Sequence, residues 1–149
     1  MVGSMNSTSE RDCLKNLAEF RYQMRKFLNF SEIASERCGI PAQQYQLMQV
    51  IAAIPEDQQA SITYLAERMI LRHNSTVELV DRAERAGLVN RQSDPKDMRR
   101  SIIYLTAEGR AILDRLVAEH LSELAPRCEQ LITALRDLQS AAETQTDPS

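Results

Sequence analysis

The sequence lacks the features that mark several large classes of protein. No segment contains the roughly 18 uninterrupted apolar residues that a membrane span needs, and no apolar core follows the N-terminus, as a secretory signal requires. The three cysteines, Cys13, Cys38 and Cys128, are odd in number and widely spaced, which favours free thiols in a reducing compartment over a disulfide framework. We therefore expect a cytoplasmic chain that does not associate with membranes.

Motifs of catalysis and of metal binding are missing as well. The chain has no glycine-rich phosphate-binding loop, no metallopeptidase histidine pair and no nucleophile elbow. The two histidines, His73 and His120, are far apart and have no cluster of Cys, His or Glu around them, so no metal site is expected. The sequence thus predicts a protein that is not an enzyme and that uses no cofactor.

Negative charge dominates the chain but is unevenly distributed. The formal net charge is −3. The segment from Arg68 to Arg100 holds eight basic and five acidic residues, a local charge of +3 that leaves −6 for the rest. One basic module on an acidic molecule suits phosphate binding at one end. Taken alone, the charge distribution fits a solvated surface of mixed sign better than DNA binding.

Glycine and proline are rare, with four and five residues respectively in 149, so most of the chain is predicted to be helical. Thr63 and Thr106 are expected to cap helices, because a threonine hydroxyl accepts a hydrogen bond from a free backbone N–H. Gly87 is placed to end a helix, and Pro126 to interrupt the last one. The expected helices cover residues 9–38, 41–55, 64–69, 72–86 and the chain from 107 onward.

Two short segments, residues 88–91 and 101–105, are predicted to pair as a β-hairpin. Between them, residues 92–100 are polar and charged and contain the turn former Asp94-Pro95, so a long charged tip is expected. Ser61-Ile62 is a candidate for one more short strand. The predicted fold class is mainly α with a small β-hairpin.

Residues 62–105 combine a short helix, a tight turn, a second helix and a charged hairpin, which is the order of a winged helix-turn-helix. In that arrangement the second helix enters the major groove of DNA, and the hairpin, or wing, reaches the backbone or the minor groove. Side chains that can bond to DNA gather at the start of the second helix and on the wing. They are Arg72, His73, Asn74, Ser75 and Thr76, with Lys96, Arg99 and Arg100.

The same region carries several linked segments in a fixed order. They are Leu65-Ala66-Glu67-Arg68-Met69, Leu71-Arg72-His73-Asn74-Ser75-Thr76-Val77, Leu79-Val80-Asp81-Arg82, Gly87-Leu88-Val89, Asp94-Pro95-x-Asp97-x-Arg99 and Leu105-Thr106-x-x-Gly109. In this order and spacing they resemble the MarR family of winged helix-turn-helix transcriptional regulators. With the flanking helices included, the resemblance covers most of residues 20–124.

The resemblance implies a homodimer held by residues 5–38 and 106–139, with a DNA-binding domain at 41–105. Residues 140–149 are expected to form a flexible tail, and residues 1–4 to be a cloning remnant. The recognition helix, about 72–86, would lie in the major groove of a pseudo-palindromic operator, and the wing, about 90–104, in the minor groove. By the same resemblance Arg99 enters the minor groove and Asp97 braces the wing.

The chain departs from the family pattern at two positions. Ile70 stands in the turn where the family often has glycine, so we expect either a turn without a left-handed residue or a strained one. Arg72 stands where a serine cap is common, so the recognition helix is expected to begin with a weaker cap.

Several alternatives remain open at this stage. The resemblance implies a repressor released by a small aromatic or lipophilic effector; Tyr22, Phe27, Phe30 and Tyr45 either line its pocket or form ordinary core. Cys13 on the first helix invites an oxidant-sensing role, but its neighbours give no reason for a reactive thiol. The alternative function is a winged-helix module that binds protein and not an operator.

Overall fold

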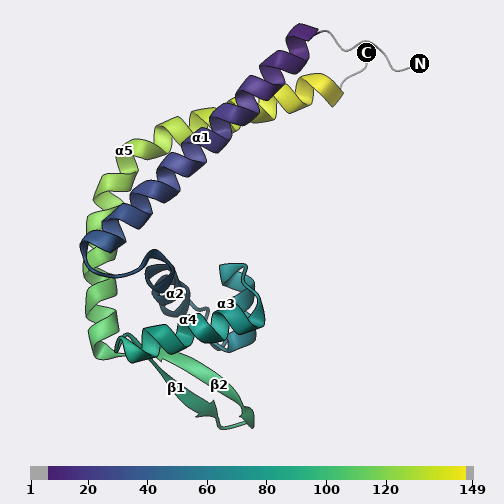
Figure 1. Cartoon of the computed structure of the whole chain (residues 1–149). Coiled ribbons are helices and arrows are strands. Elements are labelled where there is room, and N and C mark those ends of the chain that lie inside the picture. Colours follow the sequence, from purple (N-terminus) through teal and green to yellow (C-terminus); the bar gives the residue numbers. More distant parts are fainter. Residues whose placement is uncertain (1–6, 147–149) are drawn as a thin grey trace. The chain divides into compact units, whose positions relative to one another are not determined.

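The computed structural model describes residues 7–146 and confirms a mainly helical chain with one hairpin. Its elements in order are α1 (Ser7–Arg37), α2 (Ala42–Ala52), α3 (Ile62–Met69), α4 (His73–Arg85), β1 (Val89–Asp94), β2 (Asp97–Leu105) and α5 (Ala107–Thr146) (Figure 1). Residues 1–4, the expected cloning remnant, lie outside the described residues.

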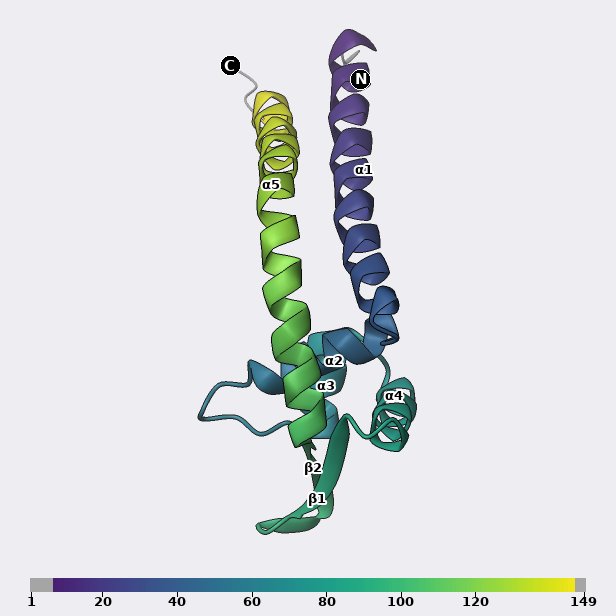
Figure 2. The same cartoon turned by 90° about the vertical axis from the view of Figure 1, so that its left-hand side faces the viewer.

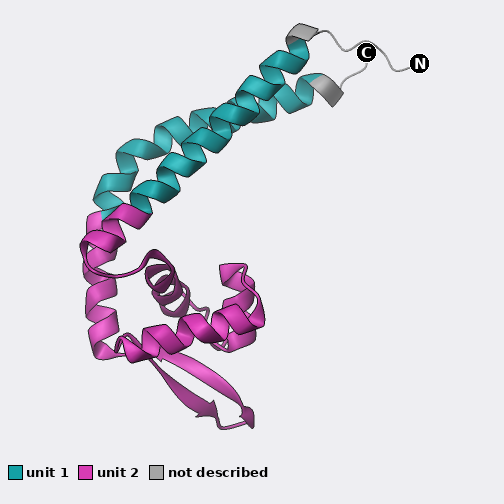
Figure 3. Ribbon diagram, in the orientation of Figure 1, with its two compact units in different colours: residues 1–31, 120–149 teal, residues 32–119 magenta. Residues whose placement is uncertain are grey.

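The chain divides into two compact units, residues 1–31 with 120–149 and residues 32–119 (Figure 3). We call them unit 1 and unit 2. In unit 1, the first part of α1 and the last part of α5 run side by side (Figures 1 and 2), and the Cys13 thiol lies 3.9 Å from the carbonyl oxygen of Ala141. Unit 2 contains the helix-turn-helix and the hairpin.

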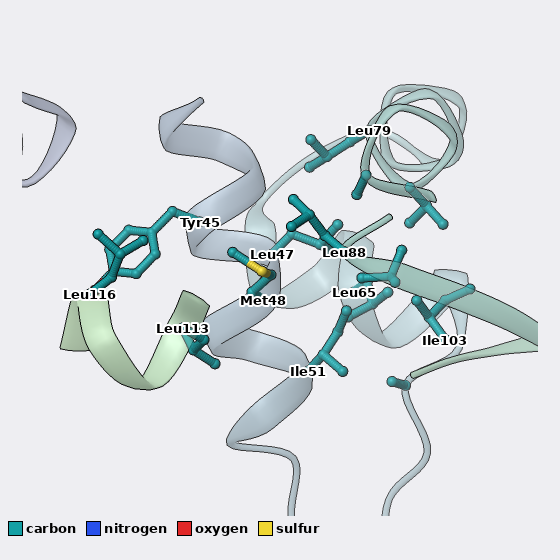
Figure 4. Close-up of a cluster of buried hydrophobic side chains, with 14 residues drawn as sticks. Tyr45, Leu47, Met48, Ile51, Leu65, Leu79, Leu88, Ile103, Leu113 and Leu116 are labelled. Atoms are coloured by element: carbon teal, nitrogen blue, oxygen red, sulfur yellow. The ribbon is translucent and has the colours of Figure 1, made fainter. Parts of the chain in front are cut away.

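The core of unit 2 draws apolar side chains from every element that it contains except the C-terminal end of α1 (Figure 4). Burying one such side chain contributes about 1.5–3 kcal/mol, so this cluster stabilises the position of α4 against α2 and the hairpin. The labelled members are Tyr45, Leu47, Met48, Ile51, Leu65, Leu79, Leu88, Ile103, Leu113 and Leu116.

Three helices end in the same hydrogen-bonded turn, with a left-handed residue just after the helix. Gly39 and Gly87 occupy that position after α1 and α4 with φ of +75°, as glycine does readily. Ile70 occupies it after α3 with φ of 54°. The residue after each one donates its backbone N–H to a carbonyl five residues earlier, as Leu71 does to Ala66. Of the two expectations for Ile70, a turn free of left-handed backbone is therefore wrong, and the strained turn is found.

The residues that cap the starts of the helices agree with the predicted caps in part. Thr106 caps α5 as predicted: its hydroxyl accepts from the N–H of Gly109 (2.9 Å) and donates to the carbonyl of Gly87 (2.6 Å). The cap of α3 is Ser61 and not Thr63, because the chain enters the helix two residues earlier and the Ser61 hydroxyl accepts from the N–H of Tyr64. Arg72 at the start of α4 makes no side-chain cap, as expected.

The last helix differs from the prediction in two ways: it is continuous through Pro126, and it ends later than expected. Pro126 does not interrupt α5, since a proline removes a single N–H donor and the turns on both sides keep theirs. The helix also continues to Thr146, past residue 140, where a flexible tail was expected to begin.

The hairpin is longer than predicted and its tip is correspondingly short. β1 and β2 pair in antiparallel register from Val89 opposite Leu105 to Ser93 opposite Ser101, with an irregularity before Asp94. Only Pro95 and Lys96 lie between the strands. Most of the polar stretch expected as a loop is strand, because a two-stranded ribbon exposes both faces to water. Ser61 forms an isolated bridge to Ile102, so the expected third strand is reduced to one pair.

Candidate nucleic-acid interface

Helix α4 has one buried face and one polar exposed face. Thr76, Leu79, Val80 and Ala83 recur at spacings of three and four and are buried in the core of unit 2. Leu79 points from α4 into that core in Figure 4. The opposite face is exposed and carries polar and charged residues only. They are His73, Asn74, Ser75, Glu78, Arg82 and Arg85.

The first turn of α4 presents most of the predicted contact residues to solvent. Arg72, His73, Asn74 and Ser75 are all exposed. Thr76 is the exception: its side chain is fully buried, and its hydroxyl donates to the carbonyl of Arg72 (3.0 Å). The prediction that Thr76 contacts DNA is therefore wrong, because its position in the helical repeat turns it toward the core.

The wing places its three predicted basic side chains, Lys96, Arg99 and Arg100, in solvent. Asp97 accepts a hydrogen bond from the backbone N–H of Arg99 (3.1 Å), so its contact with the wing is to the backbone. Asp94 is 2% exposed and accepts from the N–H of Lys96 (2.9 Å), which closes the two-residue turn. Asp94 was expected only as a turn former, and no local pattern of the sequence indicates its burial.

Arg91 joins the wing to the recognition helix. From β1 its guanidinium forms ion pairs with two carboxylates of α4, those of Asp81 and Glu84 (3.7 Å to the latter). The Arg91 side chain is about a quarter exposed, which screens the pairs less than at an open surface. No local pattern of the sequence indicates this link, because the turn at Gly87 separates Arg91 from both carboxylates.

The four aromatic residues considered for an effector pocket have different surroundings. Tyr45 is buried in the core of unit 2, where burial raises the pKa of its hydroxyl, so it packs as ordinary core. In unit 1, Tyr22 is half exposed, and Phe27 is partly buried. The Phe30 ring lies 5.9 Å from the His120 ring and 4.1 Å from the Arg127 guanidinium carbon.

The structure also shows the surroundings of His120, one of the two histidines considered for a metal site. Burial of His120 lowers the pKa of its imidazole, and nearby Glu123 opposes this. Among residues 7–146, no group of three or more His, Cys, Asp or Glu side chains is arranged to hold a metal ion. Within the same residues, none of the helices combines the length and the apolar character of a membrane span.

Known proteins resemble this chain in sequence and in fold. A family model described as the MarR family matches residues 39–100. The transcriptional regulator HosA of Escherichia coli O111:H- is 34% identical over 99 residues, which is 62% of this chain and 71% of HosA. A putative transcriptional regulatory protein for the hcr operon of Thauera aromatica is 31% identical over 96 residues, 64% of this chain and 56% of that protein.

Solved structures agree with the fold. The MarR family transcription regulator SP03579 aligns with a TM-score of 0.72 at 23% identity and covers 92% of both chains. A mutant of S. aureus MepR bound to an oligodeoxyribonucleotide aligns with a TM-score of 0.59 at 19% identity, over 83% of this chain and 94% of MepR. At such identities the structures support the winged-helix fold, and the HosA match supports the family. This chain belongs to the MarR family of transcriptional regulators.

Proposed function

We propose that this member of the family is a homodimeric repressor that binds a pseudo-palindromic operator and releases it when a small-molecule effector binds. In this proposal α4 lies in the major groove and the wing in the minor groove of each half-site. The observation that carries it is the exposed polar face of α4 beside a wing with three exposed cations in the same compact unit.

The first turn of α4 supplies the proposed base contacts. His73, Asn74 and Ser75 are exposed and can donate or accept hydrogen bonds, which is the chemistry of base edges in the major groove. Arg72 precedes the helix and is also exposed, so it is suited to a phosphate. On the wing, Lys96 is assigned to phosphate and Arg99 to the minor groove.

A protein-binding adaptor would need an apolar patch on the exposed face of α4. The exposed residues of α4 are all polar or charged; of its apolar residues Leu79, Val80 and Ala83 are buried, and Val77 is partly buried. The composition of this helix therefore favours DNA over a protein partner.

The dimer is supported by apolar side chains that the single chain leaves in water. On the two helices of unit 1 they include Leu14, 67% exposed, and Leu121, 63% exposed. Others on these helices are Leu17, Leu28, Ile132 and Leu135. Scattered apolar residues are normal on a surface, but a series along two paired helices is the composition of a subunit interface.

The effector would bind in a cavity next to the wing. Unit 2 holds a largely apolar cavity of about 280 Å³. Its lining includes Ile51 of α2, Ile54 just after that helix, Ile102 and Ile103 of β2, and Arg110 at the start of α5. Apolar walls with one cationic group are typical of sites for small amphipathic molecules. A lipophilic compound with an acidic group would match this lining.

The test of operator binding is fluorescence anisotropy on labelled DNA from upstream of the protein's own gene, with a scrambled duplex as control. Binding should be tight, sequence-preferring and strongly reduced at higher salt, because phosphate contacts release counterions. Equal and weak binding to both duplexes, followed by failure to enrich any sequence from a random library, would contradict the proposal. Candidate effectors are then added to the complex, and no release across a chemically broad set would remove the effector from it.

A further inference from the structure

Helix α4 carries three carboxylates, and the structure divides them into two kinds. Asp81 and Glu84 form ion pairs with Arg91 of β1. Glu78 is exposed, and within residues 7–146 no ion pair or hydrogen bond is found for its carboxylate. It is therefore the acidic group of α4 that is left available to an outside partner.

The position of Glu78 on the helix defines what that partner faces. With about 3.6 residues per turn, Glu78 lies opposite the face formed by Thr76, Leu79, Val80 and Ala83. Asn74, one turn earlier, is exposed on the same outward face. If α4 enters the major groove, Glu78 therefore points at base edges in the middle of the helix's contact and not at the flanking phosphates.

We propose that Glu78 is a specificity-determining residue that accepts a hydrogen bond from the N4 amino group of a cytosine in each half-site. The inference rests on the proposed binding of α4 in the major groove. It adds a residue that the polar first turn does not include, and it assigns the base that this residue selects.

The chemistry of a carboxylate explains why Glu78 would prefer cytosine and why it would disfavour the other bases. An ionised glutamate only accepts hydrogen bonds. In the major groove guanine presents the acceptors N7 and O6, and thymine presents the acceptor O4. Adenine has an N6 donor but carries the acceptor N7 beside it, whereas cytosine presents the N4 donor with no acceptor of its own in that groove. A glutamate facing O6 or N7 of guanine leaves two acceptors opposed and desolvated, which costs binding free energy. Glu78 thus selects cytosine partly by penalising the other bases.

The competing explanation is that Glu78 serves Arg82, four residues on and also exposed. Such pairs stabilise a helix weakly. The structure shows no ion pair between them, while it does form one at the same spacing between Arg110 and Asp114. Under this explanation, substitution of Glu78 would leave the selected DNA sequence unchanged.

The test is selection of duplexes from a randomised library with the full-length wild type, Glu78→Gln, Glu78→Ala and the control Glu36→Gln. Glu36 is an exposed glutamate of α1 in unit 2, so its variant removes the same charge at a distance from α4. Matching thermal melting curves establish that all four proteins are folded. Affinities are then measured on wild-type operators with each base at the selected position.

The wild type and Glu36→Gln should select a fixed cytosine at one position of each half-site. Glu78→Gln should shift that position toward adenine, which a glutamine amide recognises, and Glu78→Ala should reduce discrimination there by about tenfold or more. Identical selected motifs for wild type and both Glu78 variants overturn the inference and leave the proposed function standing. A wild type that enriches no sequence overturns both.

Discussion

Ile70 is a β-branched residue in a backbone conformation that suits glycine. A non-glycine residue in the left-handed region costs about 1–2 kcal/mol, because its Cβ crowds the following carbonyl. The Ile70 side chain is 91% exposed, so it recovers little of this by burial. Gly39 and Gly87 adopt equivalent turns without that cost.

We predict that Ile70→Gly raises the free energy of unfolding by about 0.5–1 kcal/mol. The substitution relieves backbone strain in the folded state, and the extra freedom of glycine in the unfolded chain offsets part of this benefit. Urea denaturation at fixed protein concentration measures the change. Ile70→Ala keeps a Cβ in the same conformation and should leave the stability nearly unaltered. A less stable glycine variant would show that the isoleucine side chain has a partner.

Gly109, in the first turn of α5, marks a close approach between two backbone segments. A Cβ at this position would overlap the carbonyl oxygen of Leu88. A backbone atom cannot move aside as a flexible side chain does, so α5 would have to shift away from the end of α4.

Gly109→Ala is therefore expected to lower the free energy of unfolding by more than about 2 kcal/mol, in the range of core overpacking. Thermal melting compares it with Gly39→Ala, where nothing lies within 4 Å of the added Cβ and only the left-handed backbone is penalised. The second variant should lose about 1 kcal/mol. Equal losses in the two would contradict the role of the close approach.

At the scale of the element, the wing is a two-stranded ribbon, and the carboxylates of Asp94 and Asp97 accept hydrogen bonds from backbone N–H groups at its turn. Arg99 is exposed on this ribbon, and none of the ion pairs found in the described residues involves it. Its removal should therefore affect DNA binding and not folding.

Arg99→Ala should weaken operator binding by at least tenfold and reduce the dependence of affinity on salt, with the melting temperature unaltered. Anisotropy titrations at several salt concentrations measure both quantities. Arg115→Ala, which removes an exposed arginine from α5 in the same unit, serves as the control. Operator affinity that is the same in the Arg99 variant and in wild type would exclude the wing from the mechanism.

The elements show which structural features a sequence can predict. Hydrophobic periodicity and turn residues located the helix-turn-helix and the hairpin, since these signals are local. Choosing Ser61 over Thr63 as the cap required knowing where the chain enters α3, because both hydroxyls are suitable. The burial of Thr76 and the pairing of Arg91 with Asp81 depend on tertiary contacts that no local pattern encodes. Residues 92–100 of the wing were mistaken for a loop because they are polar and, apart from Asp94, mostly exposed, so they lack the alternating apolar pattern of a strand.

At the scale of the whole molecule, the exposed apolar residues of unit 1 predict that two chains associate through this unit. Leu121→Glu would place a charge in the proposed interface, where it has no counterion and loses its water. We expect the variant to shift toward monomer and to lose affinity for a two-site operator, because two linked half-site contacts become one. Analytical ultracentrifugation and anisotropy measure the two effects. The control is Glu129→Gln, an exposed polar position on the same helix, and a Leu121 variant that remains dimeric would contradict this interface.

The ion pairs of Arg91 link the recognition helix to the wing. If both elements bind DNA as proposed, this link would set the distance between the major-groove and minor-groove contacts and their relative rotation about the DNA axis. DNA that is overwound or underwound changes that rotation without changing a single base. On the proposed mode of binding, the protein would respond to the superhelical state of its operator as well as to its sequence, and the torsional stress left by a passing polymerase would be an input to the same regulator.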